Sequence, residues 1–232
     1  MTTSRPVGRR PFGVAVVGQR LYVTNQLDST VSVVDLGGDT ETITVGSVPT
    51  GIASDPLGER VYVANQVGGG GPNSGTVSVI ETADNSVSTI PVGGAPFGVA
   101  VDPTGETLYV SSAETLGRLL IVDISTGDVD DVAVGAVPFG VAVHPDGGHV
   151  YVANTAGNSL SVVDTNTHNV TSVTVGSAPF GVSVDFAGDK VYVANRLSGT
   201  VSIISTADNQ VITTVTVGNR PIAFGKFVAP VQ

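Results

Sequence analysis

A carboxylate and three arginines are the residues of this chain with the clearest chemical potential. Glu114 is followed four residues later by Arg118, and Arg196 and Arg220 lie near the C-terminal end. A carboxylate works as a general acid or base when burial raises its pKa toward neutrality. Guanidinium groups pair with carboxylates or phosphates through two parallel hydrogen bonds. We therefore take Glu114 as the candidate catalytic residue and the three arginines as candidate anion-binding residues.

These residues also have simpler interpretations. Glu114 and Arg118 could form an exposed ion pair, which contributes little to stability. The arginines could lie over neighbouring loops as solvated surface. The two interpretations differ in where the side chains point, which depends on the fold.

Other chemical motifs are weak or missing. The chain has no Cys, so thiolate metal sites and disulfides are excluded. His144, Asp146 and His149 bracket one turn, but their spacing matches no established metal motif. The glycine-rich segment QVGGGGPNSGT, residues 66–76, lacks the GK[ST] of a phosphate loop. We predict no cofactor and no metal site, and leave open a divalent cation held in a channel by carbonyl or carboxylate oxygens.

Composition restricts the classes of partner. The net charge of −10 argues against nucleic acid, which needs a basic footprint. No apolar run reaches the length of a membrane-spanning helix, and MTTSRPVGRRPFGV has no apolar core of a signal peptide. These features predict a soluble cytoplasmic protein, with a truncated secreted form as the alternative. They favour a small-molecule partner, no membrane, and a monomer or dimer.

The chain is a tandem array. All five tyrosines occupy the same position of a repeated unit, and successive copies of its marker proline lie 38 to 47 residues apart. The proline copies are Pro11, Pro49, Pro96, Pro138, Pro179 and Pro221.

Each unit contains four short runs in which apolar residues alternate with small or polar ones, and turn sequences such as DPTG and HPDG separate them. Four strands in each period of about 40–45 residues indicate a β-propeller blade. We predict an all-β fold: a single β-propeller domain, 1–232, of five four-stranded antiparallel blades. The repeats span about 11–48, 49–95, 96–137, 138–178 and 179–220, with a closing strand at 221–232. The alternatives are six blades, one of them incomplete and built from both termini, and an open ring that closes by dimerisation.

The repeated sequence segments resemble those of a known family. YVTN at 22–25 and YVAN at 62–65, 151–154 and 192–195 are similar to the YVTN-type β-propeller repeat, as are VSVVD and the terminal PIAFGKF. The resemblance covers nearly the whole chain, although repeat three has YVSS and repeat two has Thr50 where the others have Phe. It implies the propeller fold. Its broader relatives include lactonase-like enzymes and virginiamycin B lyase-like propellers, so it does not choose one function.

Propeller geometry sorts the loops onto two ends. The loops between strands two and three, and those between blades, surround one end of the central channel, which we call the mouth; ligand sites of propellers favour this end by analogy. It receives five arginines against Asp28 and Glu114. Residues that differ between repeats are the better candidates for ligand contacts. The predicted ligand-binding set is Arg118, Arg196, Arg220, Gln26, Gln66, Thr50, Ser112, Thr155, Phe12, Phe97, Phe139 and Phe180.

Three functions remain open at this point. The first is binding of a small anionic molecule at the mouth. The second is an intracellular enzyme of lyase, lactonase or cyclase type that holds its substrate at the same mouth, with Glu114 moving the proton. The third is a protein-interaction scaffold. The phenylalanines have two interpretations, an apolar collar at the mouth and packing between adjacent blades.

Overall fold

The structure is a computed structural model, and it describes residues 4–67 and 74–223. Its secondary structure consists of twenty strands. The first two blades contain β1 (Pro11–Val17), β2 (Arg20–Asn25), β3 (Thr30–Asp35), β4 (Thr40–Thr44), β5 (Ser47–Ser54), β6 (Arg60–Val67), β7 (Thr76–Glu81) and β8 (Val87–Pro91).

The remaining three blades repeat the same order. They contain β9 (Pro96–Val101), β10 (Thr107–Ser112), β11 (Arg118–Asp123), β12 (Val129–Ala133), β13 (Pro138–Val143), β14 (His149–Asn154), β15 (Ser159–Asp164), β16 (Val170–Thr174), β17 (Pro179–Val184), β18 (Lys190–Asn195), β19 (Thr200–Ser205) and β20 (Val211–Thr216).

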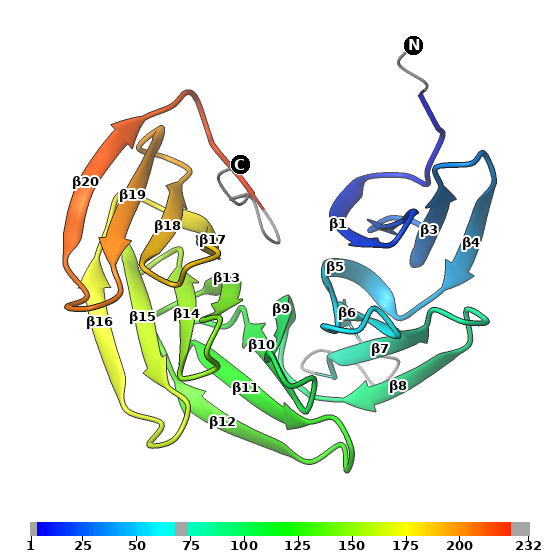
Figure 1. Cartoon of the computed structure of the whole chain (residues 1–232), viewed down its shortest axis with the longest axis horizontal. Coiled ribbons are helices and arrows are strands. Elements are labelled where there is room, and N and C mark those ends of the chain that lie inside the picture. The colour runs from blue at the N-terminus through cyan, green and yellow to red at the C-terminus, as the bar shows by residue number, and fades with distance from the viewer. Residues whose placement is uncertain (1–3, 68–73, 224–232) are drawn as a thin grey trace.

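Each group of four forms one antiparallel sheet whose spatial order follows the sequence. The strands β1, β5, β9, β13 and β17 are innermost, and the fourth strand of each sheet lies at the periphery (Figure 1). The predicted five-bladed β-propeller is therefore confirmed. In the described residues we find no helix that is long and apolar enough to cross a membrane.

The hydrophobic core is divided into four clusters, each between two consecutive blades. In the cluster between blades one and two, Tyr22, Val31 and Ile43 of blade one pack on Ile52, Val61 and Val63 of blade two. We call the face that a blade turns toward the next blade along the chain its trailing face. The face that it turns toward the preceding blade is its leading face. The period-2 alternation of each strand supplies both faces, because successive side chains point to opposite sides of the sheet.

The inner strands approach one another through a column of glycines. A β-carbon on Gly140 would stand 2.6 Å from the carbonyl oxygen of Phe180 in the next blade. On Gly51 or Gly98 it would come closer still to the carbonyl of the next blade's phenylalanine. The glycine of the repeated PFG is therefore a packing requirement, because any side chain would occupy the space of the next blade's backbone.

The ring is open between its first and last blades. Figure 1 shows the gap between β1 on one side and β17–β20 on the other. Residues Pro221–Ala223 continue the repeat into this gap, since the carbonyl of Ala223 contacts Gly181 as the Phe carbonyls contact the other glycines. Residues 224–232, the rest of the predicted closing strand, lie outside the described residues.

Aspartates hold the turns at the end of the blades opposite the mouth. The Asp102 carboxylate accepts hydrogen bonds from the backbone N–H groups of Glu106 and Thr107. It also accepts the hydroxyl and the backbone N–H of Thr104. Burial raises the pKa of Asp102, but the hydrogen bonds outweigh this effect and hold the pKa below its ordinary value.

This lowered pKa predicts a pH-dependent contribution of Asp102 to stability. A carboxyl whose folded pKa is depressed stabilises the fold above its unfolded pKa of about 3.9, and the contribution is lost as the pH falls through the folded value. We expect Asp102→Asn to unfold at lower urea than the wild type at pH 7, and the difference to narrow by about pH 2.5. Asp39→Asn is the control, because the Asp39 side chain makes no hydrogen bond to a described residue. An equal difference for Asp102→Asn at both pH values would contradict the assignment.

Candidate functional site

Four phenylalanine rings meet at the axis of the propeller, and we call them the aromatic plug. The ring centroids of Phe97 and Phe139 are 4.2 Å apart, and those of Phe139 and Phe180 are 4.7 Å apart. Phe97 also contacts Phe12 and Phe180, which belong to blades that are not its neighbours in the ring. The rings therefore converge across the channel at the mouth, and they contact one another there.

A bulge at the start of each inner strand accompanies this arrangement. The pairing of the first two strands of every blade shifts register just after the marker proline. A bulge bends a strand and redirects a side chain. The shift falls at the Phe–Gly step, where the phenylalanines leave the sheet and enter the plug.

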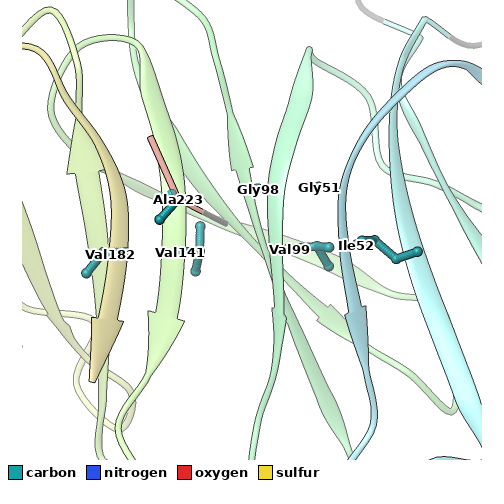
Figure 2. Close-up of a pocket in the computed structure, with 8 residues that line it drawn as sticks. Gly51, Ile52, Gly98, Val99, Val141, Val182 and Ala223 are labelled. Carbon is teal, nitrogen blue, oxygen red and sulfur yellow. The ribbon is translucent and has the colours of Figure 1, made fainter. Parts of the chain in front are cut away.

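The channel below the plug is narrow and apolar. Its cavity has a volume of about 10 Å³ and is lined by glycine, valine, isoleucine and alanine residues of the inner strands, including Gly98, Val99 and Ala223 (Figure 2). This space is close to that of a single water molecule. A ligand of metabolite size must therefore bind outside the plug.

Thr50, which replaces phenylalanine in repeat two, is fully buried. Its hydroxyl donates to the carbonyl of Ala64 at 3.1 Å and lies 2.9 Å from that of Phe97. In blades one and three, the hydroxyls of Thr24 and Ser111 connect neighbouring inner strands in the same way. Thr50 thus supplies a hydroxyl where Ala64 has none, and the geometry gives it a role between blades.

Ser112, which replaces asparagine in repeat three, has a similar explanation. The other four blades pair a buried asparagine amide with a serine hydroxyl of the third strand, as Asn154 does with Ser161 at 2.9 Å. In blade three the second position is also replaced, because Leu120 stands where the others have serine. Ser112 is fully buried and its hydroxyl accepts the backbone N–H of Ala95.

The predicted pair of Glu114 and Arg118 is not formed. The Glu114 carboxylate accepts a hydrogen bond from the hydroxyl of Ser112 at 3.3 Å. The exposed Arg118 guanidinium contacts Asp131 at 3.5 Å on the neighbouring outer strand. The two side chains therefore have separate partners, and the geometry does not combine them as an acid–base pair.

The other predicted ligand contacts at the mouth are Thr155, Gln26 and Gln66. The Thr155 hydroxyl donates to the carbonyl of Pro179 at 2.6 Å, which joins blades four and five. Gln26 is buried, and its backbone N–H bonds the carbonyl of Arg10. Gln66 is half-buried at the start of the glycine-rich segment, of which residues 68–73 lie outside the described residues.

Arg196 and Arg220 are brought together at the mouth of blade five. They line a shallow hollow of about 280 Å³ together with Leu197, Ser198, Gly199 and Asn219. The Arg196 guanidinium lies 5.9 Å from the ring centroid of Phe180, within the range of a cation–π contact. The hollow therefore borders the aromatic plug.

The charged side chains of the hollow are both cations. Neither Arg196 nor Arg220 has a carboxylate partner among the described residues, and the lining contains no acidic side chain. The Ser198 hydroxyl accepts the backbone N–H of Ser177, which leaves its own hydrogen to donate. Two other arginines of the mouth have acidic partners, since Arg9 pairs with Asp28 at 2.6 Å and Arg118 with Asp131.

In the sequence, only blade five has a cation both directly after the asparagine that ends strand two and directly before the marker proline that follows the blade. The positions of Arg196 and Arg220 are taken by Thr155 and Ala178 at the end of blade four. The sequence names both arginines among its ligand-binding candidates, but it does not show that their two loops lie side by side.

The histidines lie away from this hollow. His144 and His149 belong to a turn at the opposite end of blade four, where His144 contacts Asp146 at 2.6 Å and the carbonyl of Gly188 at 2.8 Å. His168 lies in the turn between β15 and β16 at the same end. Within residues 4–67 and 74–223, no three His, Asp or Glu side chains gather as a metal site.

Comparisons with known proteins bear on the fold. No protein-family model matches the chain, and no curated protein matches it. Among solved structures, the chain is similar to the hydrazine synthase of Kuenenia stuttgartiensis, with a TM-score of 0.80, 22% identity, and coverage of 91% of this chain and 76% of that chain.

A second similar structure is virginiamycin B lyase from Staphylococcus aureus, in a catalytically inactive histidine-to-alanine variant with quinupristin. The TM-score is 0.79 with 14% identity, and the match covers 94% of this chain and 75% of that chain. Both neighbours are propeller-like. At these identities the likeness supports the β-propeller fold and leaves the chemistry to this chain's own residues.

Proposed function

We propose that this protein is a YVTN-type β-propeller that binds a small anionic molecule in the hollow of Arg196 and Arg220. The observation that carries the proposal is that two arginines line one hollow and have no acidic partner among the described residues. Two such groups, a hydroxyl and an amide suit a carboxylate or phosphate. The adjacent Phe180 ring and Leu197 would contact an apolar part of the same ligand.

The enzyme alternative has less support. The similar lyase is catalytically inactive as a histidine-to-alanine variant, but all three histidines of this chain lie at the end opposite the mouth. Glu114 is engaged with Ser112 in blade three and is not among the residues that line the hollow. We therefore favour binding over turnover.

The proposal predicts the loss of anion affinity in two arginine variants. Inorganic phosphate, citrate and a panel of phosphate esters and dicarboxylates would be screened by thermal shift and then titrated by calorimetry. A ligand at 100 times its dissociation constant adds about 2.7 kcal/mol of stability. Each lost charge-assisted hydrogen bond costs roughly 1.5–3 kcal/mol, so Arg196→Ala and Arg220→Ala should each weaken binding about 10- to 100-fold.

Arg118→Ala is the matched control, because Arg118 lies at the mouth but is paired with Asp131. It should bind the same anion with unchanged affinity. Equal affinity in the wild type and in Arg196→Ala would contradict the proposed site. A protein that responds to none of these anions would instead favour the interaction scaffold.

A further inference from the structure

The turn between β13 and β14 differs from the same turn of three other blades. Asp55, Asp102 and Asp185 occupy one equivalent position in blades two, three and five, directly after the inner strand. The carboxylate of each accepts a backbone N–H of its own turn, as that of Asp55 does from Glu59 at 2.8 Å. Blade four has His144 at this position. A titratable ring therefore replaces a local acceptor.

The His144 side chain reaches the next blade. Its Nε2 lies 2.8 Å from the carbonyl oxygen of Gly188, in the turn between β17 and β18 of blade five. Its Nδ1 lies 2.6 Å from the carboxylate of Asp146, and the side chain is only 15% exposed. We call His144, Asp146 and the Gly188 carbonyl the histidine joint. It adds a polar contact to the apolar packing of the trailing face of blade four on the leading face of blade five.

The Asp146 carboxylate also holds its own turn. It accepts the backbone N–H of Gly148 at 2.8 Å. This bond is the main cause that lowers the pKa of Asp146, burial opposes it, and the contact with His144 lowers the pKa further. The carboxyl is therefore ionised at any pH above its ordinary value of about 3.9, and an ionised carboxylate only accepts hydrogen bonds.

The two partners of the ring decide which protons it must carry. Both are acceptors, because the Gly188 carbonyl has no hydrogen and Asp146 is ionised. A neutral imidazole has one N–H and can donate to only one of them. If Nδ1 lacked its proton, its lone pair would face the carboxylate at 2.6 Å, and the only donor to it would be the backbone N–H of Asp146 at 3.3 Å. The imidazolium donates to both acceptors, so the geometry fits the cation.

We propose that the histidine joint is a pH-sensitive switch that fastens blade four to blade five when His144 is protonated. A histidine that is free in water takes up its second proton at about pH 6.5. Stability that depends on a protonated histidine is present in acid and is lost as the pH rises. The lowered pKa of Asp146 keeps its carboxylate ionised throughout the mildly acidic range, so the joint persists there.

Other titratable groups face the joint from β14. The ring centroids of His149 and Tyr151 lie 6.3 Å and 6.4 Å from that of His144. Burial raises the pKa of Tyr151 to about 12, so the phenol stays neutral in this range. His149 is paired in register with Asp164 of β15. Because His149 carries the same titratable group as His144, a test must remove the two rings separately.

The neighbouring blades add charged groups that are held in their own turns. The turn of blade five carries three of them, Asp185, Asp189 and Lys190. The Asp185 carboxylate accepts the backbone N–H of Lys190 at 3.2 Å. On the side of blade three, the turn lies against Pro103, and the preceding Asp102 bonds its own turn. No residue of the joint lines the anion-binding hollow, so the switch does not depend on the proposed function.

The test follows urea unfolding of the full chain at pH 8 and at pH 5. His144→Asn removes the titratable ring and keeps a side-chain oxygen, which the aspartates of the other blades also provide. Asp146→Asn removes the charge of the carboxylate. The controls are His149→Asn, which removes the neighbouring ring, and His168→Asn, which removes an exposed histidine between β15 and β16.

We expect the wild type to gain about tenfold in its folding equilibrium constant, relative to His144→Asn, when the pH falls from 8 to 5. Asp146→Asn should lose most of this gain, because its uncharged amide does not require a proton on Nδ1. His149→Asn and His168→Asn should keep it. The same pH dependence in the wild type and in His144→Asn would overturn the proposal.

Nitrogen NMR of the histidine rings tests the switch in the wild type, even if a variant does not fold. At pH 5, both ring N–H protons of His144 should give signals, because each is held in a hydrogen bond. The N–H protons of the exposed His168 should exchange with water and be lost. A His144 ring with a single N–H at pH 5 would contradict the switch.

Discussion

Gly98→Ala is expected to lower the free energy of unfolding by about 3 kcal/mol, the upper part of the range for overpacking a close-packed site. The new β-carbon would collide with the carbonyl oxygen of Phe139 in the next blade. That oxygen belongs to the backbone of an inner strand and also accepts a hydrogen bond from Ser111 at 2.6 Å. Relief of the collision must therefore move one blade relative to the other.

Gly157→Ala is the matched control for this substitution. Gly157 is exposed, and a β-carbon there would meet its nearest neighbour, the Ser159 hydroxyl, at 3.2 Å. Urea unfolding followed by circular dichroism would compare the two variants. We expect a much lower midpoint for Gly98→Ala and a midpoint close to the wild type for Gly157→Ala. Coinciding midpoints would show that the inner strands can separate without cost.

Phe97→Ala is expected to destabilise the protein by about 3 kcal/mol, through lost burial and the cavity that remains. Phe97 is nearly buried and contacts the rings of Phe12, Phe139 and Phe180, so it is the centre of the aromatic plug. Edge-to-face and tilted ring pairs add stability beyond the area that they bury. The cavity would also open the axis of the propeller at the mouth.

Phe186→Ala tests whether this loss is specific to the plug. Phe186 is 78% exposed in the turn between β17 and β18, and its removal should change stability by no more than about 0.5 kcal/mol. Thermal and urea unfolding of both variants would provide the comparison. If Phe97→Ala unfolded at the same temperature and urea concentration as Phe186→Ala, the contacts between the rings would not stabilise the fold.

Much of the fold can be predicted from the sequence because the same strand and turn patterns occur in each of the five repeats. The alternation of apolar residues, the turn sequences and the position of the tyrosines predict strands, blades and their number, and the structure confirms them. Local propensity and pattern agree in every unit, which is the condition under which sequence-based inference works best.

The departures from the repeat are harder to interpret. The pattern predicts ligand contacts for Thr50 and Ser112 because each breaks its column. The structure places both inside, where the hydroxyl of Thr50 compensates for Ala64 and Ser112 is matched by Leu120. Such a compensating change cannot be recognised from one column of the aligned repeats. The compensating residue lies on another strand, and its hydrogen bonds reach into the next blade.

The repeat pattern alone predicts a propeller, with five blades ahead of six, and names the candidate residues of the mouth. Three further features emerge only once the blades are assembled: Phe12, Phe97, Phe139 and Phe180 meet at the axis, Arg118 turns to Asp131, and Arg196 and Arg220 share a hollow. The physical reason is the range of the interactions. Strand formation depends on neighbours along the chain, whereas pairing of rings and charges depends on how the blades close around a common axis.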